Sequence, residues 1–200
     1  MRIRSLVPIV AAALAATSLT AQTTYTADFP AVRRLFLDQQ QPRAAYTLSV
    51  ASAYVRQELG RSRDETVGAR LVGAEDRLDE LVARLRASGV GSVTTLDSAF
   101  TQTDMLLAEH HWRLAAWELA NPRSASRQMV GEDLGHAATF FAQSFTFAGR
   151  EPAPAAAAAI AEAKRVSGVI ATTDAIPKET AQVLDALGKL IVPVATVAIR

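Results

Sequence analysis

The stretch from Thr94 to Asn121 carries the clearest periodic pattern in the chain. Its apolar stripe recurs at alternating steps of three and four residues, at Phe100, Thr103, Leu107, His110, Leu114 and Trp117. This alternation is typical of a helix that packs lengthwise on other helices, because it keeps one stripe of side chains facing a partner. Thr94, with Asp97 three residues on, is the expected N-cap. Asn121-Pro122 ends the helix, since proline disfavours helix in the residue before it.

Three further segments predict long helices, and each is bounded by residues that cap or break helices. They are residues 42–59, 62–87 and 125–148. The second has the stripe Val67, Leu71, Ala74, Leu78, Leu81 and Leu85, and Ser62 is its expected N-cap. One bent helix over 42–87 is an alternative. Shorter helices are expected after Pro154 and Pro177. The predicted fold is therefore all-α, an antiparallel helical bundle of four long helices plus one or two shorter ones.

The first residues predict export. Two arginines precede a short apolar run and small residues, which together are typical of a secretory signal peptide spanning residues 1–21. Cleavage after Ala21 is preferred to cleavage after Ala15, and an uncleaved membrane anchor is the alternative. We then expect a flexible leader or short helix at 22–41, the bundle domain at 42–192 and an apolar tail at 193–200. The mature chain is expected in the periplasm or secreted, without a transmembrane span.

The composition of the chain excludes several kinds of binding partner and several kinds of chemical site. Removing residues 1–21 takes two of 21 basic residues and none of 20 acidic ones, so the mature chain is near −1. A nearly neutral chain without a basic run argues against nucleic acid as a partner. The absence of cysteine excludes disulfides, thiolate metal sites, a thiol nucleophile and covalently attached haem. A protein partner or self-association is expected instead.

The three histidines define the one chemical hypothesis. If residues 94–121 and 125–148 form an antiparallel hairpin centred near Arg123, His110 and His136 lie at the same level, and Asp133 faces Arg113. Imidazoles and carboxylates bind transition metals, and bundle cores often hold such sites. The candidate ligands of a transition metal or a non-covalent haem are His110, His111, His136, Asp133 and Glu109.

A structural role is the competing interpretation of the same residues. His110 and His111 are adjacent, so their side chains point about 100° apart and do not easily aim at one point. Under this interpretation His110 is hydrogen-bonded across the hairpin in a buried polar layer, and His111 is partly exposed.

The sequence contains none of the common catalytic motifs, which argues against an enzyme without excluding one. The predicted function is therefore binding or assembly by an exported helical bundle. A bundle that binds a metal or haem through His110 and His136 is the alternative. A carrier of hydrophobic ligands, using the phenylalanines between Phe140 and Phe147, is a further alternative.

Overall fold

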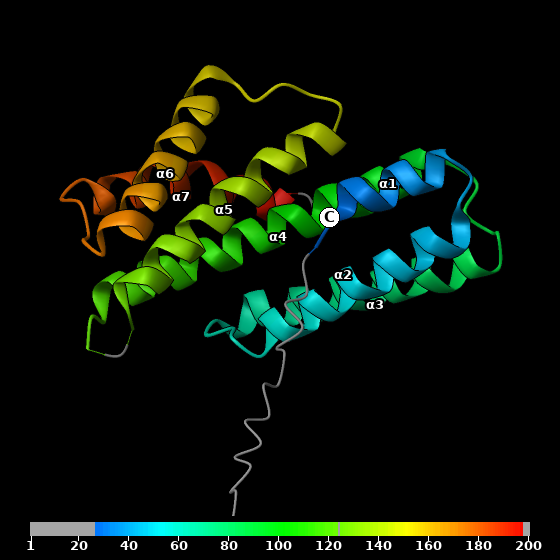
Figure 1. Ribbon diagram of the computed structural model, residues 1–200, viewed down its shortest axis with the longest axis horizontal. Helices are drawn as coiled ribbons and strands as arrows, with labels where there is room; N and C mark the ends of the chain where they lie inside the picture. Colours follow the sequence, from blue (N-terminus) through cyan, green and yellow to red (C-terminus); the bar gives the residue numbers. More distant parts are fainter. Residues whose placement is uncertain (1–26, 124, 198–200) are drawn as a thin grey trace, which may run out of the picture.

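The computed structural model describes residues 27–123 and 125–197, and its regular elements there are seven helices (Figure 1). They are α1 (Phe29–Leu37), α2 (Gln41–Leu59), α3 (Glu65–Arg86), α4 (Val93–Ala120), α5 (Arg127–Phe147), α6 (Pro154–Thr173) and α7 (Thr180–Val197). The predicted all-α bundle is confirmed. The expected signal peptide, residues 1–21, lies outside the described residues.

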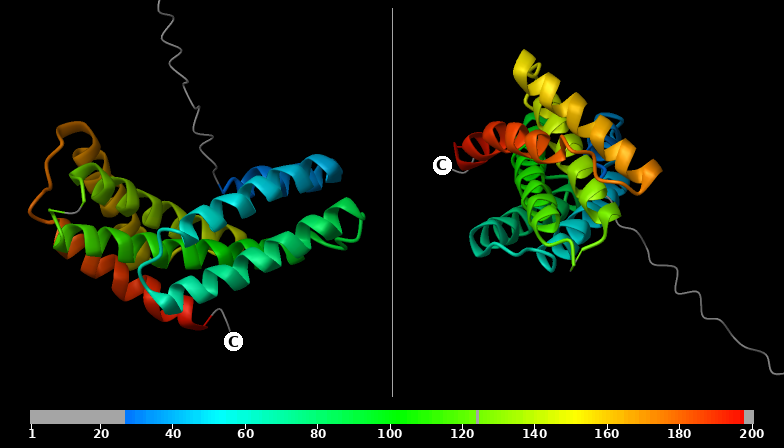
Figure 2. Two further views of the ribbon diagram at one scale, coloured as in Figure 1. Left: turned by 90° about the horizontal axis from the view of Figure 1, so that it is seen from below. Right: turned by 90° about the vertical axis from the view of Figure 1, so that its left-hand side faces the viewer.

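Helix α4 is the element around which the others are arranged. It runs along the length of the molecule and contacts α1, α3, α5 and α7 (Figures 1 and 2). Helices α2 and α3 form a hairpin beside it, whereas α6 lies across α5 and α7 packs on the second half of α4. Helix α1 lies within residues 22–41, for which the sequence predicted either a flexible leader or a short helix. The structure has a short helix there. It docks on α4 by stacking Phe29 on Phe100, with ring centroids 4.6 Å apart.

The start of α4 differs from the prediction. Ser92 is the N-cap and its hydroxyl accepts a hydrogen bond from the backbone N–H of Thr95, so the cap at Thr94 is wrong. Asp97 instead accepts a hydrogen bond of 2.8 Å from Nε of Arg33 on α1. The acidic residue expected in the capping box therefore serves to hold α1 against α4.

The chain breaks between α2 and α3, so two helices form where one bent helix was the alternative. Asp64 is the N-cap of α3 and accepts hydrogen bonds from the backbone N–H groups of Thr66 and Val67. The prediction of Ser62 as N-cap is wrong, because its hydroxyl donates to the backbone oxygen of Asp64 instead. The turn at residues 60–64 brings the start of α3 near the second half of α4.

Helix α7 continues through Pro193, where the sequence predicted an interruption and an apolar tail. Ile191 and Ala195 are buried on either side of the proline, so packing holds this turn although proline removes one backbone donor. Further along α4, the indole Nε1 of Trp112 donates a 2.8 Å hydrogen bond to the backbone oxygen of Leu184 on α7. In the described part of the chain, no helix combines the length and the apolar character needed to cross a membrane.

Candidate metal centre

His111 is the central residue of a buried polar cluster between α2, α4 and α5. Its side chain has no exposed surface. Nδ1 lies 2.6 Å from Oδ1 of Asp133, and Nε2 lies 2.9 Å from the hydroxyl of Tyr54. Burial lowers the pKa of His111 despite the hydrogen bond with Asp133, so the imidazole is neutral at neutral pH. Because a carboxylate only accepts, Nδ1–H donates to Asp133, and Nε2 accepts the hydroxyl hydrogen of Tyr54.

Asp133 on α5 is ionised although it is buried. Its second oxygen, Oδ2, accepts a 2.6 Å hydrogen bond from Nη2 of Arg61, which lies in the turn between α2 and α3. Burial by itself would raise the pKa of Asp133. The hydrogen bond from His111 and the charge of Arg61 outweigh burial and lower that pKa. Both oxygens of this carboxylate are therefore used by the protein.

Glu58 on α2 is the second ionised carboxylate of the cluster. Its Oε2 accepts hydrogen bonds from Nη1 of Arg61 at 3.0 Å and from Nε2 of His110 at 3.2 Å. Burial opposes ionisation here too, but the hydrogen bond from His110 and the charge of Arg61 lower the pKa of Glu58. A single guanidinium, that of Arg61, thus lies between two buried carboxylates.

Glu118 reveals the charge balance of this cluster. It lies two helical turns beyond His111 on α4 and is buried. Burial, followed by the negative charge of Asp133, raises the pKa of Glu118 to about 8. The carboxyl therefore keeps its proton at neutral pH. Two ionised carboxylates therefore face one guanidinium, and a third carboxyl beside them, that of Glu118, stays protonated.

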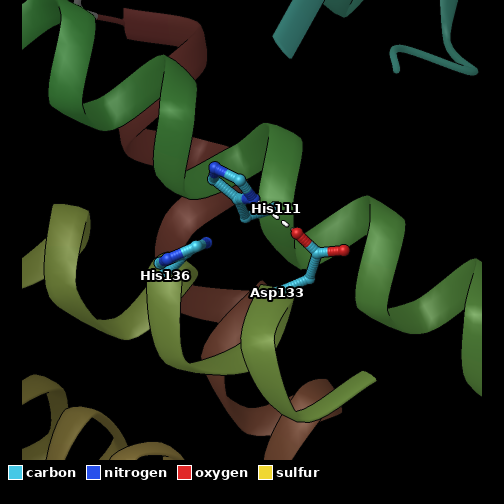
Figure 3. Close-up of side chains that lie close together, drawn as sticks. All are labelled: His111, Asp133 and His136. Atoms are coloured by element: carbon cyan, nitrogen blue, oxygen red, sulfur yellow. Dashed lines mark hydrogen bonds and ion pairs between the residues drawn. The ribbon is translucent and has the colours of Figure 1, made fainter. Parts of the chain in front are cut away.

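His136 completes a group of three metal-binding side chains (Figure 3). It follows Asp133 by three residues on α5, so both point from the same side of that helix toward His111. The ring centroids of His111 and His136 are 4.9 Å apart. One donor atom from each of His111, Asp133 and His136 lies within 4.8 Å of the other two. His136 is exposed, whereas the other two are buried, so the group lies at the edge of the cluster.

The remaining sequence-predicted ligands lie outside this group. The ring of His110 is 5.2 Å from that of His111, but its Nε2 is directed at Glu58. Glu109 is buried on another side of α4, where its Oε2 accepts a 2.5 Å hydrogen bond from Nη2 of Arg70 on α3. The structure therefore brings His111, Asp133 and His136 together and separates Glu109 from them.

Three details of the predicted hairpin are wrong because the rotation of α4 differs from the one assumed. His111 is fully buried, not partly exposed, and it faces α5 in place of His110. His110 bonds to α2 and not across the hairpin. The predicted pair of Asp133 with Arg113 is absent, since Nη1 of Arg113 donates to Asp64 at 2.8 Å.

Sequence reasoning missed three members of the cluster: Tyr54, Glu58 and Arg61. One of them carried a signal. Glu58 follows Leu48, Ala51 and Val55 at steps of three, four and three, which places a carboxylate on a buried stripe. Such a position needs a buried partner. Arg61, which supplies it, lies in a turn and follows no periodic pattern.

Asp104 is a further buried carboxyl on α4, one heptad before His111. It has no exposed surface, and in the described part of the chain neither of its oxygens has a hydrogen-bond partner. Burial raises the pKa of Asp104 well above its ordinary value. This carboxyl is therefore protonated under conditions that ionise an exposed aspartate.

Comparison of the chain with protein-family models, with curated proteins and with solved structures gives no match.

Proposed function

We propose that this protein is an exported helical bundle that acts by binding, and that its ligand is a divalent transition-metal ion held by His111, Asp133 and His136. The observation that carries the proposal is the approach of one donor atom from each residue to within 4.8 Å of the others. The donors come from two helices that pack against each other, so the fold already holds them at short range.

Charge supports a cation at this place. The ionised carboxylates of Asp133 and Glu58 face the guanidinium of Arg61. Beside them Glu118, whose pKa is about 8, retains its proton at neutral pH. A buried site that resists further negative charge gains from a bound cation. A metal ion between Nδ1 of His111 and Asp133 would supply that charge, because a metal binds the unprotonated nitrogen of a neutral imidazole. The proton of Nδ1 would move to Nε2, and the hydrogen bond between Nε2 and Tyr54 would reverse its direction.

The donor set indicates the class of metal. Two imidazole nitrogens and one carboxylate oxygen suit zinc, copper(II), nickel or cobalt better than calcium or magnesium, which prefer oxygen ligands. Three protein ligands at an edge that includes the exposed His136 leave a coordination position for water or a further ligand. A bare ion is favoured over haem because the donors converge on one side, whereas two axial haem ligands approach from opposite faces.

The test uses the chain produced without a His tag, stripped with a chelator and then titrated with zinc by calorimetry. We expect one ion per chain and a higher melting temperature. At a free zinc concentration 100-fold above Kd, binding stabilises the fold by about 2.7 kcal/mol. That corresponds to about 5–10 °C for a chain of this size.

Two variants distinguish a residue that binds the metal from a nearby residue that does not. His136→Ala removes an exposed ligand and should abolish the zinc-dependent rise in melting temperature. His110→Gln keeps a side-chain donor next to Glu58, outside the ligand group, and should retain it. Zinc binding that survives His136→Ala, or no binding by the unmodified chain, would favour the purely structural polar layer. Detection outside the cytoplasm of a chain that begins at Gln22 tests the export part of the proposal.

A further inference from the structure

A second candidate site lies on the other side of His110, between the start of α3 and the second half of α4. A cavity of about 290 Å³ opens there to the surface. Its walls include His110, Trp112, Trp117, Arg63, Arg113 and Val67. Both tryptophans of the chain line this one cavity. Aromatic walls with a few charged groups are typical of sites for small organic ligands.

The fold holds Trp112 in place as one wall. Its indole Nε1 donates to the backbone oxygen of Leu184 at 2.8 Å. Gly188, one turn further along α7, lies so close that a Cβ atom there would overlap the indole ring. The ring is therefore fixed by a hydrogen bond and by the absence of a side chain at Gly188, and it is available as a flat, preformed surface.

Among the described residues, the charges at the cavity leave one cation, Arg63, without an ion pair. The guanidinium of Arg113 is paired with Glu109 at 2.8 Å and with Asp64 at 2.8 Å. Arg63 instead lies over Trp117, with its Cζ 3.7 Å from the ring centroid, and no carboxylate of the described residues forms an ion pair with it. Arginine presents a planar fork of donors that matches a carboxylate.

From this arrangement we infer that the cavity binds a small carboxylate with a flat apolar body, of the size of a phenyl-substituted acid. The apolar body lies against the tryptophan rings, and the carboxylate accepts hydrogen bonds from Arg63. The volume, at the lower end of the range for ligand pockets, suits a ligand with one aromatic ring. This inference does not depend on the metal proposal, because none of the three candidate metal ligands lines the cavity.

The test is a titration of the full chain with phenylacetate and hydrocinnamate, each compared with its uncharged amide. Tryptophan fluorescence reports on the cavity directly, and calorimetry checks the stoichiometry. We expect at least one acid to bind with a Kd below about 1 mM, and at least about tenfold more tightly than its amide. Arg63→Gln should reduce this acid-to-amide preference to about one.

Two control variants define the outcomes. Arg86→Gln removes an exposed arginine at the far end of α3 and should leave the preference unchanged. His136→Ala should also leave it unchanged, which separates this site from the candidate metal centre. The inference is overturned if neither acid binds saturably, if acid and amide bind equally, or if Arg63→Gln keeps the preference.

Discussion

Asp104 offers a direct test of how burial controls charge in this core. Its side chain is fully buried, and in the described residues neither carboxylate oxygen has a partner. Burial raises the pKa of Asp104 well above its ordinary value, because the ionised form would lose hydration without gaining a hydrogen bond. Asp104→Asn keeps the shape of the side chain and removes its titration.

The sign of the effect follows from proton binding. In the unfolded chain Asp104 ionises near its ordinary pKa of about 3.9. Above that pH the folded chain still holds the proton, so unfolding releases it and the free energy of unfolding falls as pH rises. The fall is about 1.4 kcal/mol per pH unit and ends when the pH passes the folded-state pKa. The asparagine variant lacks this loss.

Urea unfolding, followed by circular dichroism at several pH values, measures the difference between the variant and the unmodified chain. We expect the advantage of Asp104→Asn to grow by about 1.4 kcal/mol per pH unit from about pH 5 upward, or about 3–6 °C in melting temperature. Asp76→Asn, on the exposed side of α3, is the matched control for loss of an aspartate. An advantage that stays constant or shrinks as pH rises would refute the assignment of Asp104 as a buried, unpartnered acid.

Two further substitutions test the packing and the hydrogen bonds described above. Gly188→Ala should destabilise the fold by about 1–3 kcal/mol in urea unfolding, because the added methyl group overlaps Trp112. Gly73→Ala, whose methyl group meets nothing within 4 Å, should not. Tyr54→Phe should lower stability by about 1–3 kcal/mol in thermal melting, since Nε2 of His111 loses its buried donor. An unchanged melting temperature would show that this hydrogen bond contributes nothing to stability.

Spacing was sufficient to predict the long helices. The predicted bounds 42–59, 62–87, 94–121 and 125–148 differ from the observed ends by three residues at most. Alternating steps of three and four make a continuous stripe only on a helix, so the pattern identifies the element and its buried side together. The capping residues were less predictable. Several Ser, Thr and Asp residues stand near the starts of α3 and α4, and Asp97 is used for a tertiary contact with Arg33 and not for a cap.

The candidate site was predictable in part, for a geometric reason. Distance from the hairpin turn fixes the level of a residue along the helix axis, and the rings of His110, His111 and His136 do lie at neighbouring levels. It does not fix the rotation of the helix about its axis, and the side chains of two successive residues point about 100° apart. His110 and His111 therefore could not be told apart, and the structure directs His111 at α5 and His110 at α2. The carboxylates that accept hydrogen bonds from these two histidines, Glu58 and Asp133, also share Arg61. Because that arginine lies in a turn without periodicity, no spacing rule could assign it.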